Sequence, residues 1–415
     1  MDATLKNRMS GAMSEQRDGM NPNGNFQWWN PSRIIIGDGV SESLPNLLDS
    51  MHHLDGRRRA FVVTHTSAKD YGLLDYLLDT MKGSGREVVH VFGEVPNRAN
   101  LDQVSEAALK AKETEADLWI ALGGGSAMDV CKAGAILQVN DGSLSDYSGA
   151  NLMRERPNPI ICIPTTAGTG AEVSPHAFII DSKEKKKLFI CDHGIIPSVA
   201  VLDPQLTRTL RASLVASAAI TAMNQAISAI VIKPANHFSV CLATKALELS
   251  ARSIEEAYRN NSTDMEARCD MLTAAAMGGL ALQTSLPGIT AAIAHSACTL
   301  HEINYGIALG IANLHLIEDC LQLMPIASAI IAGALGVNRN GLSNEATGFA
   351  CSEKLRELYA KVDIKLSFKD HGVPADDQSV TSLLISSLDS PCMTFNPPAV
   401  TESLTCERLI RKCIG

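Results

Sequence analysis

The chain has 415 residues, of which 46% are hydrophobic and 20% are charged, and its formal net charge is −9 at pH 7. At about 100–200 residues per domain, this length predicts two or three domains, and the apolar fraction excludes a chain that is disordered throughout. The excess of acidic residues argues against nucleic acids and anionic membranes as partners, because both are bound by clustered Lys and Arg.

The cysteines indicate a reducing environment. There are 11 of them, scattered along the chain, with no CxxC pair and no metal-type spacing to histidine. This usage is typical of an intracellular chain with free thiols, so we expect a cytoplasmic protein. Residues 1–26 are polar and lack the apolar core of a signal peptide, and we expect them to be a disordered leader. The apolar stretch Ser213–Ile232 could span a bilayer, but Asn224 and Gln225 interrupt it, which favours a buried helix.

Short β-branched runs alternate with helical stretches in the first half of the chain. We expect strands at Arg33–Gly37, Ala60–Thr64, Glu87–Phe92, Asp117–Leu122 and Pro159–Pro164. Alternating strands and helices predict an α/β layer with a mostly parallel sheet. Later in this half, Phe178–Asp181 and Lys187–Cys191 flank a charged run, which predicts a hairpin with a solvated turn.

The pattern changes after Val199–Pro204, where long helical stretches replace the strands. They include Ser213–Ile232, Phe238–Arg259, Met265–Thr284, Ile289–Glu302 and Ile307–Leu323. The sequence therefore predicts an α/β domain over 27–204 and an all-helical domain over 205–415. We expect the ligand site between them, because pockets favour domain interfaces.

A glycine-rich turn follows the predicted strand Asp117–Leu122. It consists of Gly123, Gly124, Gly125 and Ser126, and Asp129 stands in the first turn of the next helix. Glycines let a ligand approach the backbone and a helix N-terminus attracts anions, so the turn suits a pyrophosphate. The alternative is a capping box, with Ser126 as the cap and Asp129 reaching back, but this does not account for three glycines.

A second loop of small residues follows Pro159–Pro164. Its threonines are Thr165, Thr166 and Thr169. Small hydroxyl and glycine residues at a strand end can wrap a ribose or a nicotinamide amide. The alternative is a polar loop without a ligand. Two such loops at strand ends of one α/β layer favour the first interpretation.

The segments GGGSAMDVCK and IPTTAGTGAEVS resemble the two cofactor loops of the iron-containing (group III) alcohol dehydrogenase family. Further segments agree in order and spacing, among them Asn30–Arg33, Val95–Asn97, Lys187 with Cys191–Asp192, Val201–Pro204, GVPADD and FNPPAVT. The resemblance covers roughly residues 27–415. It implies an N-terminal dinucleotide-binding domain and a C-terminal helical domain. It also implies hydride transfer between NAD(P)H and an alcohol–carbonyl pair, a small-molecule substrate and a homo-oligomer, with Lys187 among the cofactor-binding residues.

The family binds a divalent metal ion, usually iron or zinc, through one Asp and three His of the helical domain. The matching positions of this sequence are Thr221, Gln225, Ala291 and Tyr305. Thr, Gln and Ala cannot supply carboxylate and imidazole ligands, and a protonated Tyr is a poor ligand. We therefore expect no bound metal and a pocket in which Thr221, Gln225 and Ala291 face the substrate. For Thr221 and Gln225 the alternative is that the two side chains pair with each other. The alternative is a displaced metal site on His295 and His301.

Without a metal, either another group has to act on the substrate oxygen or the reaction does not need such polarisation. Tyr305 stands where a family ligand stood, and His295 matches a family histidine near the metal and the nicotinamide, so we take both as candidate catalytic residues. For His295 the alternative is a hydrogen-bonded core histidine. For Tyr305 the alternative is a side chain that fills the vacated metal cavity. Both alternatives stay open.

One cofactor position also departs from the family, which often has an Asp that binds the ribose hydroxyls of NAD. The matching residue is His65. Without the carboxylate, rejection of a 2′-phosphate weakens, so we expect NADP(H) slightly more than NAD(H). The alternative is that His65 is an inert loop residue.

Two functions remain as hypotheses. The first is a metal-independent, NAD(P)H-dependent alcohol dehydrogenase or carbonyl reductase of specialised metabolism, which the two cofactor loops favour. The second is a non-redox enzyme, such as an isomerase, cyclase or dehydratase, that reuses the same cleft, which the loss of all four metal ligands favours.

Overall fold

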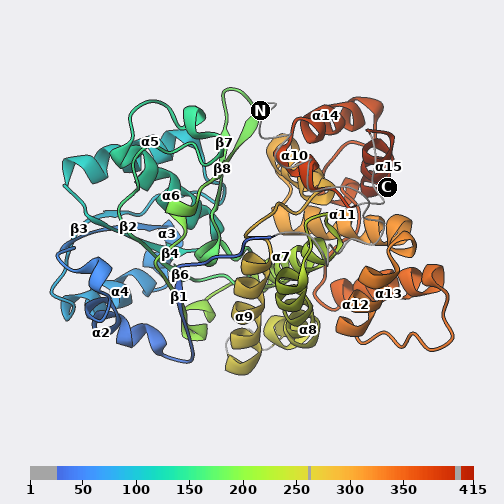
Figure 1. Cartoon of the computed structure of the whole chain (residues 1–415), viewed down its shortest axis with the longest axis horizontal. Coiled ribbons are helices and arrows are strands. Elements are labelled where there is room, and N and C mark those ends of the chain that lie inside the picture. Colours follow the sequence, from blue (N-terminus) through green and yellow to red (C-terminus); the bar gives the residue numbers. More distant parts are fainter. Residues whose placement is uncertain (1–25, 260–262, 398–402) are drawn as a thin grey trace. The chain divides into compact units, whose positions relative to one another are not determined.

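The structure is a computed structural model of the whole chain, and it describes residues 26–259, 263–397 and 403–415 (Figure 1). These residues form two compact units. An α/β unit consists of Asn30–Arg211 and the segment that ends at Ala276, and a helical unit consists of Ala212–Arg259 and Met277–Gly415 with the segment before Asn30. The expected leader, 1–26, lies outside the described residues except for Phe26.

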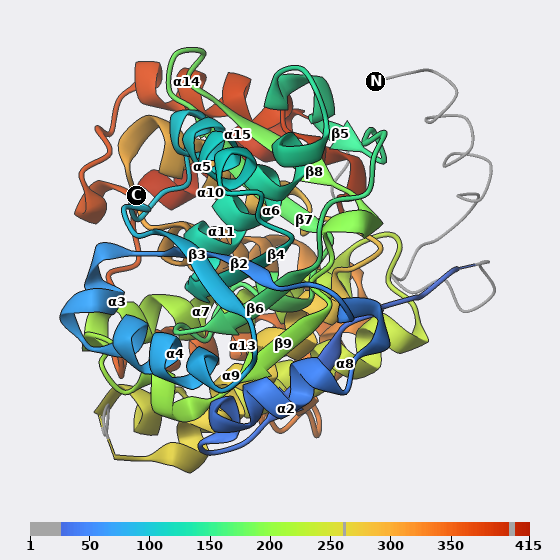
Figure 2. The same cartoon turned by 90° about the vertical axis from the view of Figure 1, so that its left-hand side faces the viewer.

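A six-stranded sheet forms the centre of the α/β unit, and all of its strand pairs are parallel, which confirms the expected parallel sheet (Figure 2). The strand order is β1-β9-β6-β4-β2-β3. The strands are β1 (Arg33–Ile36), β2 (Arg59–Thr64), β3 (Glu87–Phe92), β4 (Leu118–Gly123), β6 (Ile160–Pro164) and β9 (Val199–Leu202).

The strand order reverses beside β2. The chain passes from β2 to β3 on one side and then returns to β4 on the other side of β2. In open parallel sheets, ligands bind outside the carboxyl ends of the strands at such a reversal. The residues that follow β2 and β4 therefore lie where this fold type places a ligand.

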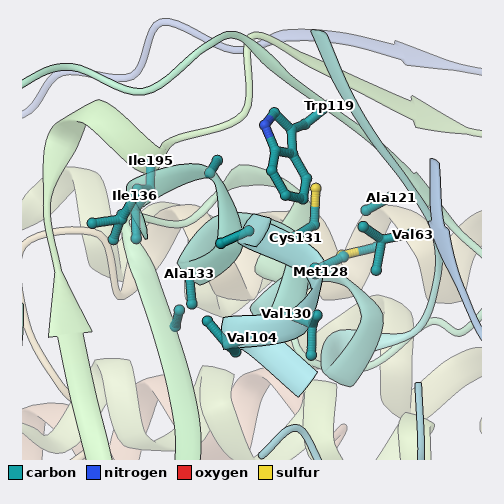
Figure 3. Close-up of a cluster of buried hydrophobic side chains, with 14 of the residues drawn as sticks. Val63, Val104, Trp119, Ala121, Met128, Val130, Cys131, Ala133, Ile136 and Ile195 are labelled. Atoms are coloured by element: carbon teal, nitrogen blue, oxygen red, sulfur yellow. The ribbon is translucent and has the colours of Figure 1, made fainter. Parts of the chain in front are cut away.

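Helices cover both faces of the sheet. Trp119 and Ala121 of β4 belong to a buried cluster with α5 (Leu101–Glu113) and α6 (Gly125–Val139), part of which Figure 3 shows. Leu118 and Ile120 of the same strand belong to a second cluster with α2 (Leu44–Asp49) and α4 (Leu73–Lys82). The alternation follows from the two-residue side-chain period of a strand. It explains why β4 reads as a continuous apolar run.

A smaller sheet lies in the same unit. Its strands β7 (His176–Asp181) and β8 (Lys186–Cys191) pair antiparallel, which confirms the expected hairpin. The two-residue strand β5 (Gly149–Ala150) pairs with β8 and was not expected from the sequence. Asn100, the N-cap of α5, bridges to Ile180 of β7, so this sheet is fixed to the α5 side of the unit.

The helical unit contains no strand among the residues that the structure describes. Its helices are α7 (Ala212–Val231), α8 (His237–Arg259), the end of α9 (Met265–Ala281), α10 (Ile289–His301), α11 (Tyr305–Cys320), α12 (Pro325–Ala334), α13 (Asn344–Ala360), α14 (Asp377–Leu388) and α15 (Ser403–Ile414). Within the described ranges, α7 is the one helix long and apolar enough to cross a membrane, and 89% of its most apolar window is buried in the protein. This agrees with the buried helix expected at Ser213–Ile232.

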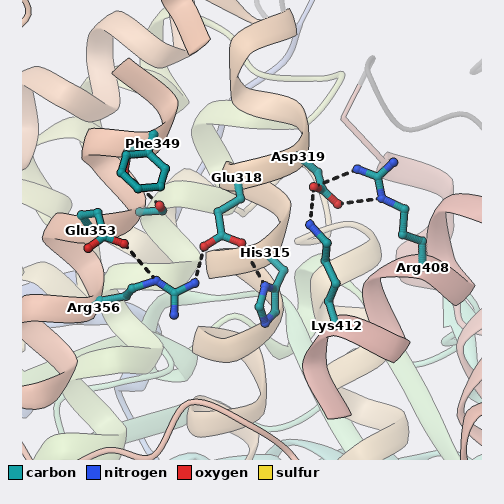
Figure 4. A network of polar contacts seen from close by, with 9 residues as sticks. His315, Glu318, Asp319, Phe349, Glu353, Arg356, Arg408 and Lys412 are labelled. Atoms are coloured by element: carbon teal, nitrogen blue, oxygen red, sulfur yellow. Dashed lines mark hydrogen bonds and ion pairs between the residues drawn. The ribbon is translucent and has the colours of Figure 1, made fainter. Parts of the chain in front are cut away.

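Ion pairs attach α13 and α15 to α11. Glu318 pairs with Arg356 of α13, and its neighbour Asp319 accepts from Lys412 of α15 at 2.5 Å and pairs with Arg408 at 2.8 Å (Figure 4). His315 lies one turn earlier, with Nδ1 3.1 Å from Glu318 Oε2. Because Asp319 is mostly buried, its pairs are less screened by water than surface ion pairs.

The first half of α9 belongs to the α/β unit. The buried guanidinium of Arg268 donates from Nη1 to Thr207 O at 2.6 Å and to Thr207 Oγ1 at 2.7 Å. From the sequence, α9 was expected in the helical domain, because it follows the same helical pattern as the stretches around it.

Candidate functional site

The two small-residue loops pack against each other. They follow the neighbouring strands β4 and β6, and the Thr165 amide donates to Gly123 O at 3.0 Å. A Cβ on Gly124 would lie 2.8 Å from Thr166 Oγ1, and one on Gly125 would lie 3.0 Å from Thr169 Oγ1. A side chain at either glycine would therefore push the second loop away. The glycines serve loop packing, a reason that the sequence analysis did not consider.

The N-terminus of α6 has no side-chain cap. The helix begins at Gly125 with Gly124 as its N-cap, and Ser126 Oγ donates to Asn97 O at 2.8 Å instead of capping. The capping-box alternative is therefore wrong. An uncapped helix start of glycine backbone, at the carboxyl end of a parallel strand, offers amide donors and a positive dipole to a phosphate. The loop therefore fits a dinucleotide.

Asp129 faces the small sheet. Its carboxylate accepts from the Phe178 amide and lies near Lys132 and Lys187. Burial raises the pKa of Asp129 to about 7, although the two lysines and this amide oppose the rise. Lys187 Nζ lies over the Phe178 ring, 5.3 Å from its centroid. Both groups connect α6 with the β7–β8 hairpin, and their contact with a cofactor stays a prediction.

Lys132 is a functional candidate that the sequence analysis missed. Its side chain is fully buried, and Nζ donates to Ala171 O at 2.5 Å, Ser174 O at 2.8 Å and His176 O at 3.0 Å. These carbonyls belong to the segment that continues the threonine loop. Burial lowers the pKa of Lys132. The available signal was a lysine within the stretch AMDVCKAGAIL, where Asp129 is the one other charged residue.

Glu172 lies beside this lysine and is only 2% exposed. Burial raises its pKa to about 7, opposed by its own backbone amide and by Lys132. No donor among the described residues reaches its Oε1. His176 follows on β7, and burial first, then the charges of Lys132 and His193, lowers its pKa to about 3. The loop is thus backed by buried ionisable groups.

His65 lies at the reversal of the sheet, directly after β2. Its Nδ1 is 2.8 Å from Val95 O. Its ring lies against the first glycine of the turn, since a Cβ on Gly123 would be 3.0 Å from His65 Cδ2. Burial lowers the pKa of His65, and the bond to Val95 opposes this only in part.

In the helical unit, the structure brings together several of the positions singled out from the sequence. Thr221 Oγ1 donates to Ser217 O at 2.7 Å, and a Cβ on Gly306 would overlap Thr221 Oγ1, so α7 meets α11 beside Tyr305. The ring of Tyr305 stacks on that of His295, with centroids 4.5 Å apart. The set therefore spans α7, α10 and α11.

Gln225 and Ala291 are buried on the same helices. Gln225 is 8% exposed, and no donor among the described residues reaches its Oε1. Ala291 is fully buried and presents only a methyl group. Leaving a buried carbonyl oxygen without a hydrogen-bond donor destabilises the folded protein by about 1–3 kcal/mol. A polar ligand could supply that donor to Gln225, whereas Ala291 has no polar atom in its side chain.

Comparison with known proteins decides the family. The model of the iron-containing alcohol dehydrogenase matches residues 31–204, and that of the C-terminal part of the Fe-containing alcohol dehydrogenase family matches residues 215–412. The chain belongs to the iron-containing alcohol dehydrogenase family. Its fold is the family fold, and the chain is an alcohol dehydrogenase-like oxidoreductase.

Relatives match along most of their length. An NAD-dependent methanol dehydrogenase of Bacillus methanolicus is 29% identical over 371 residues, which are 89% of this chain and 95% of the relative. An NADPH-dependent butanol dehydrogenase of Clostridium saccharobutylicum is 29% identical over 372 residues, 88% and 92% of the two chains. A crystal structure of 1,3-propanediol oxidoreductase is 25% identical and superposes with a TM-score of 0.87, covering 94% of this chain and 100% of that one.

The residues of this iron-containing alcohol dehydrogenase homologue do not fit the metal of its family. Thr221 bonds its own helix, Ala291 has no donor atom, and Tyr305 stacks on a histidine. Burial raises the pKa of Tyr305, so the phenol keeps its proton and is a poor ligand. In the described part of the chain, no three His, Cys, Asp or Glu side chains are grouped so that they could hold a metal ion. His295 and His301, the alternative metal site, therefore have no third ligand of these types among the described residues.

Proposed function

We propose that this protein is a metal-independent, nicotinamide-dependent alcohol dehydrogenase or carbonyl reductase that acts on a small molecule. The observation that carries the proposal is the packed pair of loops after β4 and β6, with the uncapped start of α6 in the first of them. A helix start whose first amides are not taken by a side chain leaves them available to an anion. The NAD and NADPH dependence of the two relatives supports the same cofactor class.

The helical unit supports a substrate with a hydroxyl or carbonyl oxygen. When bound, the cofactor supplies a hydride to the carbonyl carbon, and the oxygen takes up one proton to give the alcohol. Tyr305, which keeps its proton because burial raises its pKa, is suited to donate a hydrogen bond to that oxygen. Gln225 Oε1 is suited to accept from a substrate hydroxyl, because this buried oxygen has no donor among the described residues.

His295 is the second candidate for the proton step. It is 7% exposed and stacked on Tyr305, so substrate that reaches one ring is close to the other. An imidazole can supply a proton near neutral pH, whereas a phenol with a raised pKa serves better as a hydrogen-bond donor. We assign proton supply to His295 and orientation of the oxygen to Tyr305.

The proposal can be tested on the purified protein before its substrate is identified. Titration with NADH and NADPH, followed by nucleotide fluorescence, is expected to show binding of at least one. Elemental analysis is expected to show less than one iron or zinc ion per chain. Oxidation of the reduced nucleotide by a panel of aldehydes and ketones is expected to continue at the same rate after dialysis against a chelator. Loss of turnover on chelation, restored by metal, would refute metal independence. No binding of either nucleotide would favour the non-redox alternative.

Two broader expectations belong to the same proposal. We propose a homo-oligomer, as the resemblance implies, and a role in specialised metabolism, which a metal-free variant of a broad dehydrogenase fold fits. Light scattering during size-exclusion chromatography tests the first, since a mass near 44.3 kDa would show a monomer.

A further inference from the structure

The hydrogen bond of His65 identifies which of its two ring nitrogens carries the proton. His65 Nδ1 lies 2.8 Å from the carbonyl oxygen of Val95. A carbonyl oxygen can only accept, so Nδ1 has to be the protonated nitrogen. In the neutral ring, Nε2 is then left with a lone pair and acts as an acceptor.

The ring lies against the first glycine of the turn, at the reversal of the sheet. His65 is the first residue after β2, and its Cδ2 would lie 3.0 Å, and its Nε2 3.5 Å, from a Cβ on Gly123. Gly123 ends β4, and the order of the sheet reverses between β2 and β4. In dinucleotide-binding sheets, a residue in this region that accepts from the ribose 2′-hydroxyl selects NAD over NADP.

We infer that His65, with Nδ1–H held by Val95 and Nε2 as a bare acceptor, takes a hydrogen bond from the adenosine ribose and selects NAD(H) over NADP(H). A 2′-phosphate has only acceptor oxygens at this pH and would face another acceptor. The imidazole thus replaces the family carboxylate in role. The burial that lowers the pKa of His65 keeps the ring in this neutral form. The preference is opposite to the one expected from the missing carboxylate alone, and the inference rests on the proposed function.

The experiment compares two ligands that differ only at the 2′ position. ADP-ribose and 2′-phospho-ADP-ribose are titrated by calorimetry into the full-length protein, with NAD⁺ and NADP⁺ as the complete cofactors. We expect the unphosphorylated member of each pair to bind at least tenfold more tightly. The variant His65→Phe, which keeps the ring against Gly123 without an acceptor, is expected to reduce that ratio about tenfold, mainly by weakening ADP-ribose.

A second variant and a control distinguish the loss of the acceptor from a loss of folding in His65→Phe. In His65→Gln the carboxamide offers both a donor to Val95 and an acceptor, so the ratio is expected to recover in part. His90→Phe is the matched control. His90 lies on β3, the strand next to β2, and its ring centroid is 5.2 Å from that of Phe61. This variant is expected to leave the affinities for ADP-ribose and 2′-phospho-ADP-ribose unchanged. Long-range ¹H–¹⁵N spectra of histidine-labelled protein, assigned by difference from His65→Phe, are expected to show the Nδ1–H form.

Each outcome bears on the inference. An Nε2–H form of His65, tighter binding of the phosphorylated ligands, or an unchanged ratio in His65→Phe would overturn the role of His65 while leaving a nicotinamide enzyme. Failure of all four ligands to bind would overturn the proposed function, and the inference with it.

Discussion

The imidazole of His295 lies against the phenol ring of Tyr305, with ring centroids 4.5 Å apart and ring planes 18° apart. The two residues come from different helices, α10 and α11, so the stack fixes each ring by contact with the other. Tyr305 is also the first residue of α11, where Asn304 caps the helix by accepting from the Gly306 and Ile307 amides. A ring held by such a stack is suited to orient a substrate oxygen, but the same packing would also suit a residue that only fills space.

The variant Tyr305→Phe separates these two roles. It keeps the stack on His295 and removes the hydroxyl, so the protein is expected to remain as stable as wild type within about 1 kcal/mol. If the hydroxyl acts on the substrate oxygen, kcat with the best carbonyl substrate is expected to fall about 100-fold or more. Initial rates of nucleotide oxidation and urea unfolding measure the two effects. Unchanged kcat would identify Tyr305 as a filler of the vacated position.

A metal site is expected to return when the family ligands do. The variant with Thr221→Asp, Gln225→His, Ala291→His and Tyr305→His places a carboxylate and three imidazoles at the matching positions, and we expect it to bind about one zinc ion per chain because four such ligands suit a tetrahedral site. Elemental analysis after dialysis measures the content. The same variant without Tyr305→His is the control and is expected to hold much less zinc. Equal metal content in both would show that the positions are not matched to the family ligands.

The contact between the cofactor loops predicts a pair of compensating substitutions. Gly124→Ala puts a Cβ 2.8 Å from Thr166 Oγ1 and 3.2 Å from its Cγ2, so we expect weaker nucleotide binding and a loss of stability of about 1–3 kcal/mol. Thr166→Ala removes both of these atoms and leaves a Cβ at 3.6 Å, an ordinary contact. The double variant is therefore expected to regain most of the lost stability.

Urea unfolding of wild type, both single variants and the double variant gives the coupling energy directly. Additive effects would mean that the two loops do not touch as described. Gly39→Ala is unsuitable as a control because φ is positive there, whereas Gly333→Ala, with open space around its Cβ in α12, is expected to leave stability unchanged or to raise it slightly.

The sequence was sufficient where structure is set by local pattern. The apolar run that ends in GGGS predicts a buried strand, a turn and a helix, and β4 and α6 follow it closely. The alternation of short strands with helices predicts the parallel sheet. The helix bounds were less secure, because a cap decides them: α11 begins at Tyr305, two residues before the expected Ile307, since Asn304 satisfies the first amides.

Contacts between distant segments could not be predicted. Lys132 finds its three carbonyl acceptors about 40 residues further along the chain, in a segment whose path depends on the whole α/β unit. The bond between His65 and Val95, which fixes the tautomer, also joins segments that no motif connects. Without that bond, residue 65 could be interpreted only as a missing carboxylate. The stack of His295 on Tyr305 depends on how α10 and α11 pack against each other. That packing cannot be predicted from a single sequence.

The burial of Glu172 predicts a specific dependence of stability on pH. Its pKa is raised from 4.5 to about 7 in the folded protein, so between these values the folded state holds a proton that the unfolded state has released. The free energy of unfolding contributed by this group therefore falls as pH rises from 4.5 to 7 and stays low above that. Glu172→Gln removes the ionisation, and at pH 8 we expect it to be more stable than wild type by on the order of 2 kcal/mol.

Urea unfolding at pH 4.5 to 8 tests this, because the difference between Glu172→Gln and wild type is expected to grow with pH and to vanish near pH 4.5. Glu106→Gln, on the exposed side of α5, is the matched control and is expected to change stability by less than about 0.5 kcal/mol. A difference that is constant across this range would mean that Glu172 is ionised in the folded protein throughout. In that case the attraction to Lys132, which lies beside it behind the threonine loop, would outweigh the cost of burial.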